Sequence, residues 1–320
     1  MKTFFWNIVR ICDPFFALIT ILIGPFLYAA SRVRWQTPLT RAVLDWFGLG
    51  LIRHHYYEPM VLPCDLYRSL NDRRDLPGID FDVKGQLALA AQLNYRDELL
   101  QLPLEKSSAV EFGFHNDSFE SGDAEILYDF VRHFKPRRIL EVGSGQSTLI
   151  ARLAIAKNLS QNPNYACEHV CIEPYEQPWL ESLGIKIIRK RVELCPMSHF
   201  ESLESGDILF IDSSHVLRPQ GDVVHLYLSV LPRLRPGVIV HVHDVFTPRD
   251  YPEDWVLKAR RLWDEQYILE AFLSFNDRFK VLMSLNMMAL DHRDALKDAC
   301  PILQTEPDRM PGSFWFQRVS

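Results

Sequence analysis

Polar side chains that can bind a ligand or move a proton follow four short apolar runs between residues 139 and 242. The runs end at Val142, Ile172, Ile211 and Val242. The residues within or just after them that can do chemistry are Glu141, Gly143, Ser144, Gly145, Ser147, Glu173, Asp212, His215, His243 and Asp244. Open α/β sheets bind ligands beyond the carboxyl ends of their strands, so we expect these residues to meet at one sheet edge.

The turn after the first run lets a ligand approach the backbone. Gly143 and Gly145 have no Cβ, so a bound group can lie close to the main chain. The helix expected over Ser147–Ala156 offers unpaired N–H groups at its start. A dinucleotide fingerprint has a third glycine three places after the second, and here that place is Thr148. The carboxylate of Glu141 would also repel a pyrophosphate but attract a cation such as a sulfonium or an amino group. The turn therefore favours a ligand other than NAD.

The second run, His169–Glu173, ends in an acid that suits a sugar. A carboxylate can accept hydrogen bonds from both hydroxyls of a vicinal diol, such as that of a ribose. We therefore take Glu173 as the candidate ribose ligand. The alternative is an ordinary strand, turn and helix with an incidental surface acid.

At these residues the sequence resembles the class I S-adenosylmethionine-dependent methyltransferases. The segment Glu141–Gly145 looks like their first motif, and Glu173 looks like the acid that holds the adenosine ribose. The segment Gly206–His215 looks like the fourth strand of a subfamily that has an apolar run followed by Asp-x-x-His, and Pro236–Asp244 looks like its fifth strand. That subfamily is similar to the macrocin and catechol O-methyltransferases and to the cephalosporin-hydroxylase-like proteins.

The resemblance, which covers roughly residues 119–279, implies S-adenosyl-L-methionine as methyl donor. The residues that it implies for donor binding are Glu141, Gly143, Ser144, Gly145, Ser147, Glu173 and Asp212. It implies Asp212 and His215 as the catalytic residues.

Two interpretations of the acceptor chemistry remain open. In one, Asp212, His243 and Asp244 hold Mg²⁺ or Mn²⁺, which lowers the pKa of the acceptor hydroxyl and aligns its oxygen with the methyl group. The metal-dependent relatives typically have two acids after the fifth strand, whereas this chain has His243 at the first of these places. In the other interpretation no metal takes part, and His215 accepts the proton of the acceptor directly.

The elements that must position these residues alternate along the chain. From Arg137 onward, strand-like and helix-like segments follow one another, as in a doubly wound α/β domain. We predict a Rossmann-like methyltransferase sheet with helices on both faces, preceded by a hydrophobic helical segment at the N-terminus. The predicted divisions are a membrane-associating segment (1–35), a helical extension (36–118), the methyltransferase domain (119–290) and a C-terminal tail (291–320).

The N-terminal segment from Pro14 to Ala30 contains no charged residue and lies near the lower length limit for crossing a bilayer. Because Gly24-Pro25 would kink a helix, we expect a hairpin that enters and leaves the same leaflet and bends at Pro25. A signal peptide and a buried helix packed on the catalytic domain are the alternatives. Since the methyl donor is made and used in the cytosol, we expect the catalytic domain at the cytoplasmic face of the membrane.

Charge and cysteine content argue against some classes of binding partner and metal site. The net charge of −6 argues against a general nucleic-acid binder. The six cysteines are scattered, which fits a reducing compartment, and the one close pair, Cys167 and Cys171, has no second pair nearby to complete a zinc site.

Two segments could contact an acceptor. The polar and aromatic cluster Arg53–Pro59 either lines an acceptor pocket or forms a surface loop. The segment Val245–Trp255 after the fifth strand is either a lid that carries specificity or a connection stiffened by its two prolines.

The function that we predict is a membrane-associated O-methyltransferase that acts on a glycan, a lipid-linked sugar or another small hydroxylated acceptor. The alternative is a non-catalytic, membrane-anchored partner protein that retains the cofactor-binding fold. A third interpretation keeps the fold for metal-dependent chemistry other than methylation. No oligomer interface is indicated by the sequence.

Overall fold

The computed structural model describes residues 2–33, 36–175 and 177–320, and the chain divides into two compact units. The first unit comprises Met1–Tyr67 and Asp254–Leu262, and the second comprises Arg68–Glu253 and Trp263–Ser320. The part of the predicted extension from residue 68 onward therefore lies in the same unit as the predicted methyltransferase domain.

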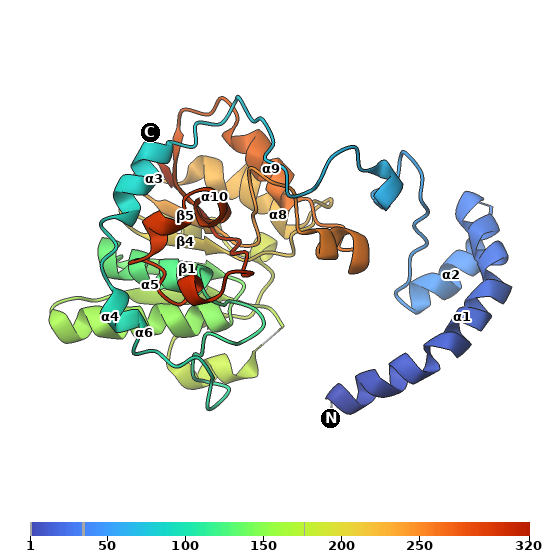
Figure 1. Ribbon diagram of the computed structural model, residues 1–320, viewed down its shortest axis with the longest axis horizontal. Helices are drawn as coiled ribbons and strands as arrows, with labels where there is room; N and C mark the ends of the chain where they lie inside the picture. The colour runs from blue at the N-terminus through green and yellow to red at the C-terminus, as the bar shows by residue number, and fades with distance from the viewer. Residues whose placement is uncertain (1, 34–35, 176) are drawn as a thin grey trace. The chain divides into compact units, whose positions relative to one another are not determined.

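The second unit is built on a seven-stranded sheet with the order β3-β2-β1-β4-β5-β7-β6 (Figure 1). The strands are β1 (Arg138–Val142), β2 (Glu168–Ile172), β3 (Lys186–Ile188), β4 (Ile208–Ile211), β5 (Ile239–Val242), β6 (Phe279–Ser284) and β7 (Phe314–Arg318). The first five strands are parallel, while β7 runs antiparallel to both β5 and β6. The chain leaves β1 in one direction and returns at β4 on its other side, so β1 and β4 flank the switch point at which ligands of such sheets bind.

Helices cover both faces of this sheet, as predicted. The helices of the second unit are α3 (Val83–Ala90), α4 (Arg96–Leu99), α5 (Asp123–Phe134), α6 (Gln146–Gln161), α7 (Ser198–Glu201), α8 (Asp222–His225), α9 (Glu265–Leu273) and α10 (Leu285–Asp291). Alternate residues of a strand point to opposite faces. Accordingly, Ile139 of β1 packs in the cluster that contains α5 and α6, whereas Leu140 packs in the cluster that contains α8 and α9. Burial on both faces explains why these strands are continuous apolar runs.

The sheet extends beyond the predicted domain end at residue 290. Residues 291–320, predicted as a tail, contain β7, which lies between β5 and β6. Phe314, Trp315 and Phe316 are all fully buried. Residues 314–316 are therefore part of the core of the sheet. The sequence did not indicate this, because β7 is short and follows a long connection.

The first unit contains α1 (Lys2–Arg32) and α2 (Pro38–Trp46). The stretch Val9–Arg32 is long and apolar enough to cross a membrane, by length and composition. The predicted hairpin is wrong, because α1 continues as one helix through Pro14 and Pro25 (Figure 1). A proline costs a helix about 3 kcal/mol through one lost hydrogen bond and a steric clash, which bends a long helix without ending it.

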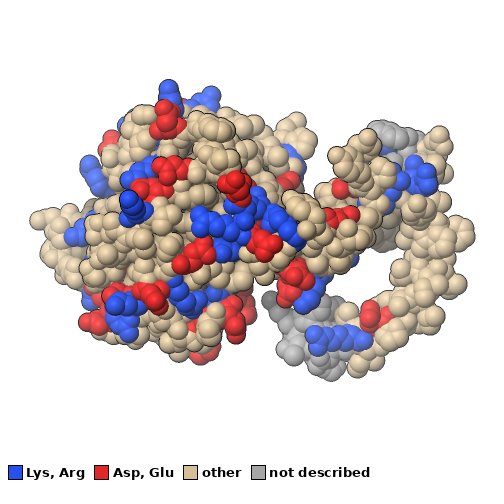
Figure 2. Space-filling view, turned by 45° about the horizontal axis from the view of Figure 1, so that its top comes forward, with Lys and Arg blue, Asp and Glu red and all other residues tan. Residues whose placement is uncertain are grey.

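Charged residues of both signs are interspersed on the surface. On the face seen in Figure 2, blue Lys and Arg side chains lie next to red Asp and Glu side chains. Ion pairs at the surface of the second unit include Arg73 with Asp291 and Lys280 with Asp82.

Candidate active site

A cavity of about 320 Å³ lies at the carboxyl ends of β1, β2 and β4, where the strand order reverses. Its volume is within the range of small-molecule sites, about 300–1,000 Å³. Three of the predicted donor ligands line it: Gly143, Glu173 and Asp212. The structure therefore brings together residues that come from three different strands.

Gly143 lines the cavity, and its backbone lies close to the residue that follows β4, Asp212. Its φ is +76°, and an added Cβ would lie 2.0 Å from the carbonyl oxygen of Asp212. The backbone is fixed there by bonds from Gly143 N to Ile172 O (3.0 Å) and from Asp212 N to Val142 O (2.8 Å). By contrast, a Cβ on Gly145 would meet, among the described atoms, only Gln177 Nε2 at 4.0 Å. Packing within the chain requires a glycine at Gly143 but leaves open space at Gly145, as a bound ligand would need.

This contrast gives a matched pair of variants. We expect Gly143→Ala to lower the free energy of unfolding by about 2–4 kcal/mol, because it combines a positive φ with a clash against the backbone. Gly145→Ala should unfold like the unmodified protein but bind S-adenosylhomocysteine more weakly, because its methyl group takes up space beside the cavity. Thermal unfolding and calorimetry measure the two effects. Equal losses of stability in both variants would contradict this division of roles.

Glu173 is held in place by the glycine turn and by its own loop. Its carboxylate accepts hydrogen bonds from Ser144 N (3.2 Å) and Tyr175 N (3.0 Å), and the residue is buried. The side chain is thus placed at the cavity wall by two backbone donors, one from each side. A carboxylate fixed in this way can bind a ribose diol with little loss of side-chain entropy.

The other four predicted donor ligands are not among the residues that line the cavity: Glu141, Ser144, Gly145 and Ser147. Glu141 is 2% exposed and accepts hydrogen bonds from Ser147 Oγ (2.6 Å) and Thr148 Oγ1 (2.9 Å). It also lies 2.8 Å from His169 Nε2 and 3.3 Å from Cys171 Sγ. The buried carboxylate therefore joins the first turn of α6 to β1 and β2, and in this way it positions the glycine turn.

His215, from the loop after β4, lies among three carboxylates. Its Nδ1–H donates to Glu265 Oε2 at 2.8 Å, while its Nε2 lies 3.3 Å from Asp212 Oδ1 and 3.6 Å from Asp244 Oδ2. Both His215 (φ 61°) and Asp244 (φ 57°) have left-handed backbone conformations. Such conformations are unfavourable for residues other than glycine and collect at functional sites. Catalytic candidates Asp212 and His215 are thus adjacent, as predicted.

Glu265 is a member of this site that the sequence analysis missed. It is 1% exposed, stands in the first turn of α9 and also accepts a hydrogen bond from Ser213 Oγ at 2.8 Å. Its bond to Nδ1 fixes the orientation of the His215 ring and leaves Nε2 directed to the other two carboxylates. No motif marks this residue, because it lies far along the chain from the strand end that it supports.

The charges of the cluster are strongly coupled. Burial alone would lower the pKa of His215, but its hydrogen bonds to Asp212 and Glu265 raise that pKa well above the usual 6.5. Burial would raise the pKa of Asp212, yet the bond from His215 and the charge of His243 hold it below its usual value. For Asp244, burial wins over the attraction of His243 and His215 and raises the pKa. A proton placed here is therefore held mainly by His215.

The predicted metal ligands Asp212, His243 and Asp244 do not converge. His243 Nε2 lies 3.5 Å from Asp244 Oδ1, but His215 Nε2 lies between the carboxylates of Asp212 and Asp244, where a bridging cation would sit. Within the described part of the chain, the sets of three ligand atoms that lie within 4.8 Å of one another are His54, Cys64 and Asp65, and Glu141, His169 and Cys171. The residues after β4 and β5 thus do not fit a divalent cation in this arrangement.

The segment after β5 packs as a connection rather than as an open lid. Tyr251 is buried, and its hydroxyl accepts a hydrogen bond from Gln266 N at 3.0 Å. Arg249 pairs with Asp291 at 2.6 Å, and Asp250 pairs with Arg68 at 2.5 Å. The interpretation as a proline-stiffened connection therefore holds for residues 245–251, and the side chains of Arg249 and Asp250 form ion pairs within the fold.

Other residues of the cavity wall also lacked a recognisable motif. Asp222, at the start of α8, accepts hydrogen bonds from Ser214 N and Ser214 Oγ, both at 2.7 Å, and so orders the loop between Asp212 and His215. Arg191 lines the cavity and pairs with Glu193 at 3.2 Å. An acid in the first turn of a helix is a known preference, which is the only signal that pointed to Asp222.

Comparison with known proteins adds an independent observation. Residues 140–245 match the model of a family described as "Methyltransferase domain". A protein of Archaeoglobus fulgidus, described as an uncharacterized protein, is 30% identical to this chain over 168 residues, which cover 48% of this chain and 74% of that protein.

Two solved structures are similar at a lower level. One is the O-methyltransferase of Bacillus cereus in complex with SAH (15% identity, 73% of this chain and 91% of that chain, TM-score 0.35). The other is the MycE methyltransferase of the mycinamycin biosynthetic pathway in complex with Mg, SAH and mycinamycin VI (11% identity, 59% and 48%, TM-score 0.30). Similarity at this level does not bear on the acceptor or the metal of this chain.

Proposed function

The chain belongs to the class I S-adenosylmethionine-dependent methyltransferases, and we propose that it transfers the methyl group to an oxygen of a hydroxylated acceptor. The observation that carries this proposal is the position of His215, whose imidazole is oriented by Glu265 and lies beside Asp212, a residue of the cavity wall. Methylation of a hydroxyl must remove one proton, and an oriented imidazole is well suited to accept it.

On the donor side, Glu173 binds the ribose hydroxyls and the turn Gly143–Gly145 approaches the adenosyl group. The side chain of Asp212 is 35% exposed, lines the cavity and has a lowered pKa, so it stays charged and favours a nearby cation. When bound, S-adenosylmethionine supplies a methyl group that is activated by its positive sulfonium.

On the acceptor side, Nε2 of His215 receives the hydroxyl proton, and Glu265 stabilises the imidazolium that forms. Because the resting pKa of His215 is high, the imidazole must first lose its proton to solvent. A cation bound beside Asp212 would ease that loss, since a like charge disfavours the protonated form. This mechanism uses no metal, in keeping with the position of His215 between the two carboxylates.

We propose a glycan, a lipid-linked sugar or another small hydroxylated molecule as the acceptor, and the cytoplasmic face of a membrane as the place of reaction. The apolar stretch Val9–Arg32 supports membrane association. A catalytic unit held near a bilayer would meet lipid-linked acceptors at a high local concentration.

Incubation of membrane extracts with the purified full-length protein and isotope-labelled methyl donor tests this function. We expect a labelled product one methylene unit heavier than its precursor, formed equally with and without a chelator. Loss of the product on chelation would restore the metal-dependent interpretation. No labelled product from a protein that binds S-adenosylhomocysteine would favour the non-catalytic partner, and a gain of one oxygen would favour the third interpretation.

A further inference from the structure

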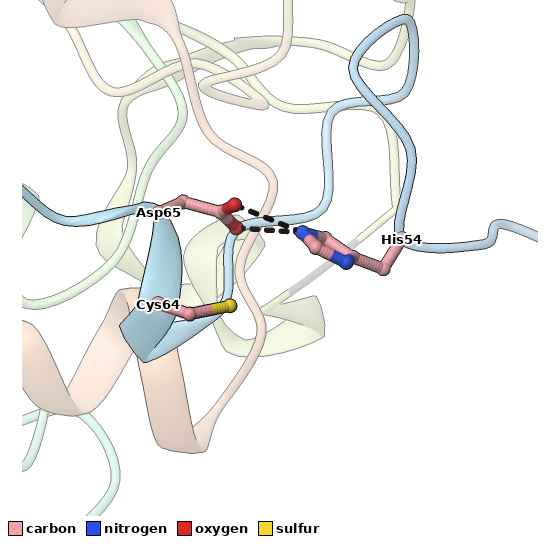
Figure 3. Close-up of side chains that lie close together, drawn as sticks. All are labelled: His54, Cys64 and Asp65. Carbon is pink, nitrogen blue, oxygen red and sulfur yellow. Dashed lines mark hydrogen bonds and ion pairs between the residues drawn. The ribbon is translucent and has the colours of Figure 1, made fainter.

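Three side chains of different ligand chemistry meet in the first unit, outside the site described above. His54 Nε2 lies 2.9 Å from both carboxylate oxygens of Asp65. Cys64 belongs to the same cluster, whose ligand atoms all lie within 4.8 Å of one another. Figure 3 shows the thiol, the carboxylate and the imidazole converging from two segments of the chain.

The local backbone structure fixes the positions of two of these ligands, Cys64 and Asp65. Cys64 and Asp65 stand in a single 3₁₀ turn, Pro63–Asp65, whose first φ is fixed by proline. The carboxylate of Asp65 accepts a hydrogen bond from Leu62 N at 2.7 Å, and Asp65 N bonds Leu62 O at 3.0 Å.

We propose that His54, Cys64 and Asp65 form a zinc site. An imidazole nitrogen, a thiolate and a carboxylate oxygen are the three ligand types that Zn²⁺ takes in proteins, whereas Mg²⁺ and Ca²⁺ require sets of oxygen ligands. The side chains of His54 and Asp65 are 41% and 38% exposed, which leaves access for the ion and for water as the fourth ligand of a tetrahedron. For Nε2 of His54 to bind the metal through its lone pair, the ring proton must reside on Nδ1, and the Cys64 thiol releases its proton to solvent as it binds as a thiolate.

Such a site would join the polar and aromatic segment at residues 53–59 to the turn at residues 63–65. The two segments are otherwise exposed, and Tyr56 and Tyr57 are among the most exposed large side chains of the chain. A metal that bridges His54 and Cys64 would therefore close a loop in a part of the chain with little core, and its binding free energy would stabilise the local fold. The inference is independent of the proposed methyl transfer.

Cobalt substitution of the tag-free full-length protein in detergent micelles tests the proposal. Co²⁺ bound to a thiolate gives an intense charge-transfer band in the near ultraviolet and tetrahedral bands in the visible, and Zn²⁺ competition should remove both. We expect about one equivalent of Co²⁺, with the affinity lowered at least about tenfold in His54→Ala and Asp65→Asn and the thiolate band lost in Cys64→Ser.

The controls are His55→Ala, an adjacent exposed histidine outside the cluster, and Cys12→Ser, a thiol elsewhere in the first unit. Both should bind Co²⁺ like the unmodified protein, and circular dichroism reports whether each variant is folded. No thiolate band in the folded, reduced protein would overturn the proposal, as would a band that survives Cys64→Ser or an affinity that His54→Ala leaves unchanged. Because the titration contains no methyl donor, its result does not depend on whether the second unit is an active methyltransferase.

Discussion

Replacing Glu173 by glutamine is expected to weaken the binding of S-adenosylhomocysteine at least about 100-fold, because it removes the charged acceptor that a ribose diol would meet. The amide has one acceptor oxygen in place of two, and its NH₂ group would face a backbone donor, Ser144 N or Tyr175 N. The variant thus loses a contact with the ribose and disturbs the glycine turn. Both effects lower the affinity for S-adenosylhomocysteine. Isothermal titration calorimetry of the full-length protein measures the change.

The matched control is Glu181→Gln, which changes an exposed glutamate that pairs with Arg189 close to the same strand end. That variant should bind S-adenosylhomocysteine within about threefold of the unmodified protein, since a surface ion pair contributes little. An unchanged affinity in Glu173→Gln would show that the adenosyl group is not bound at the end of β2, and the assignment of this cavity would fail with it.

The parts of the fold that could be predicted are those in which the local sequence alone determines the structure. Strands β1, β4 and β5 are buried on both faces, so each reads as an apolar run, and Gly143 ends the first of them at a position with φ of +76°. Polar residues directly after such runs must lie at the sheet edge, which is why Glu173 and Asp212 could be placed at one cavity from the sequence alone.

The buried position of Glu141 could have been predicted from the sequence. Side chains alternate along a strand, so Glu141 shares the face of Ile139 and not the carboxyl edge of the sheet. On that face it meets Cys171, its partner in the register of β1 with β2, and the start of α6. Applying this alternation of side chains to the strand Ile139–Val142 would have predicted that Glu141 is buried.

Other features depend on contacts between distant segments and leave little trace in sequence. Glu265 reaches His215 only because α9 packs beside the end of β4, and the general preference for an acid in the first turn of a helix does not reveal this contact. The strand β7 follows a long connection. It joins the sheet by pairing with the free edge of β5, an interaction that its own sequence does not indicate. At Pro25 the sequence indicated a break, but the local cost of a proline does not determine whether a long apolar helix ends.

The largest effect on catalysis is expected at His215. Changing it to asparagine should lower kcat by about 10²–10⁴, the usual contribution of a positioned general base, while leaving the affinity for S-adenosylhomocysteine nearly unchanged. Initial rates with labelled donor and calorimetry on the same preparation measure the two quantities. A folded variant with full activity would show that another group accepts the proton.

The role of Glu265 is separable by pH. A base acts only when unprotonated, so kcat/KM rises with pH through the pKa of His215, and because its carboxylate partners raise that pKa, we expect this limb above pH 6.5. Since Glu265 raises the pKa, Glu265→Gln should move the limb to lower pH and lower the plateau rate through poorer orientation of the ring. Glu201→Gln, an exposed glutamate on α7, is the control and should leave the profile in place. If Glu265 were only structural, its variant would lower the rate equally at every pH, because no ionisation that governs the rate would have changed.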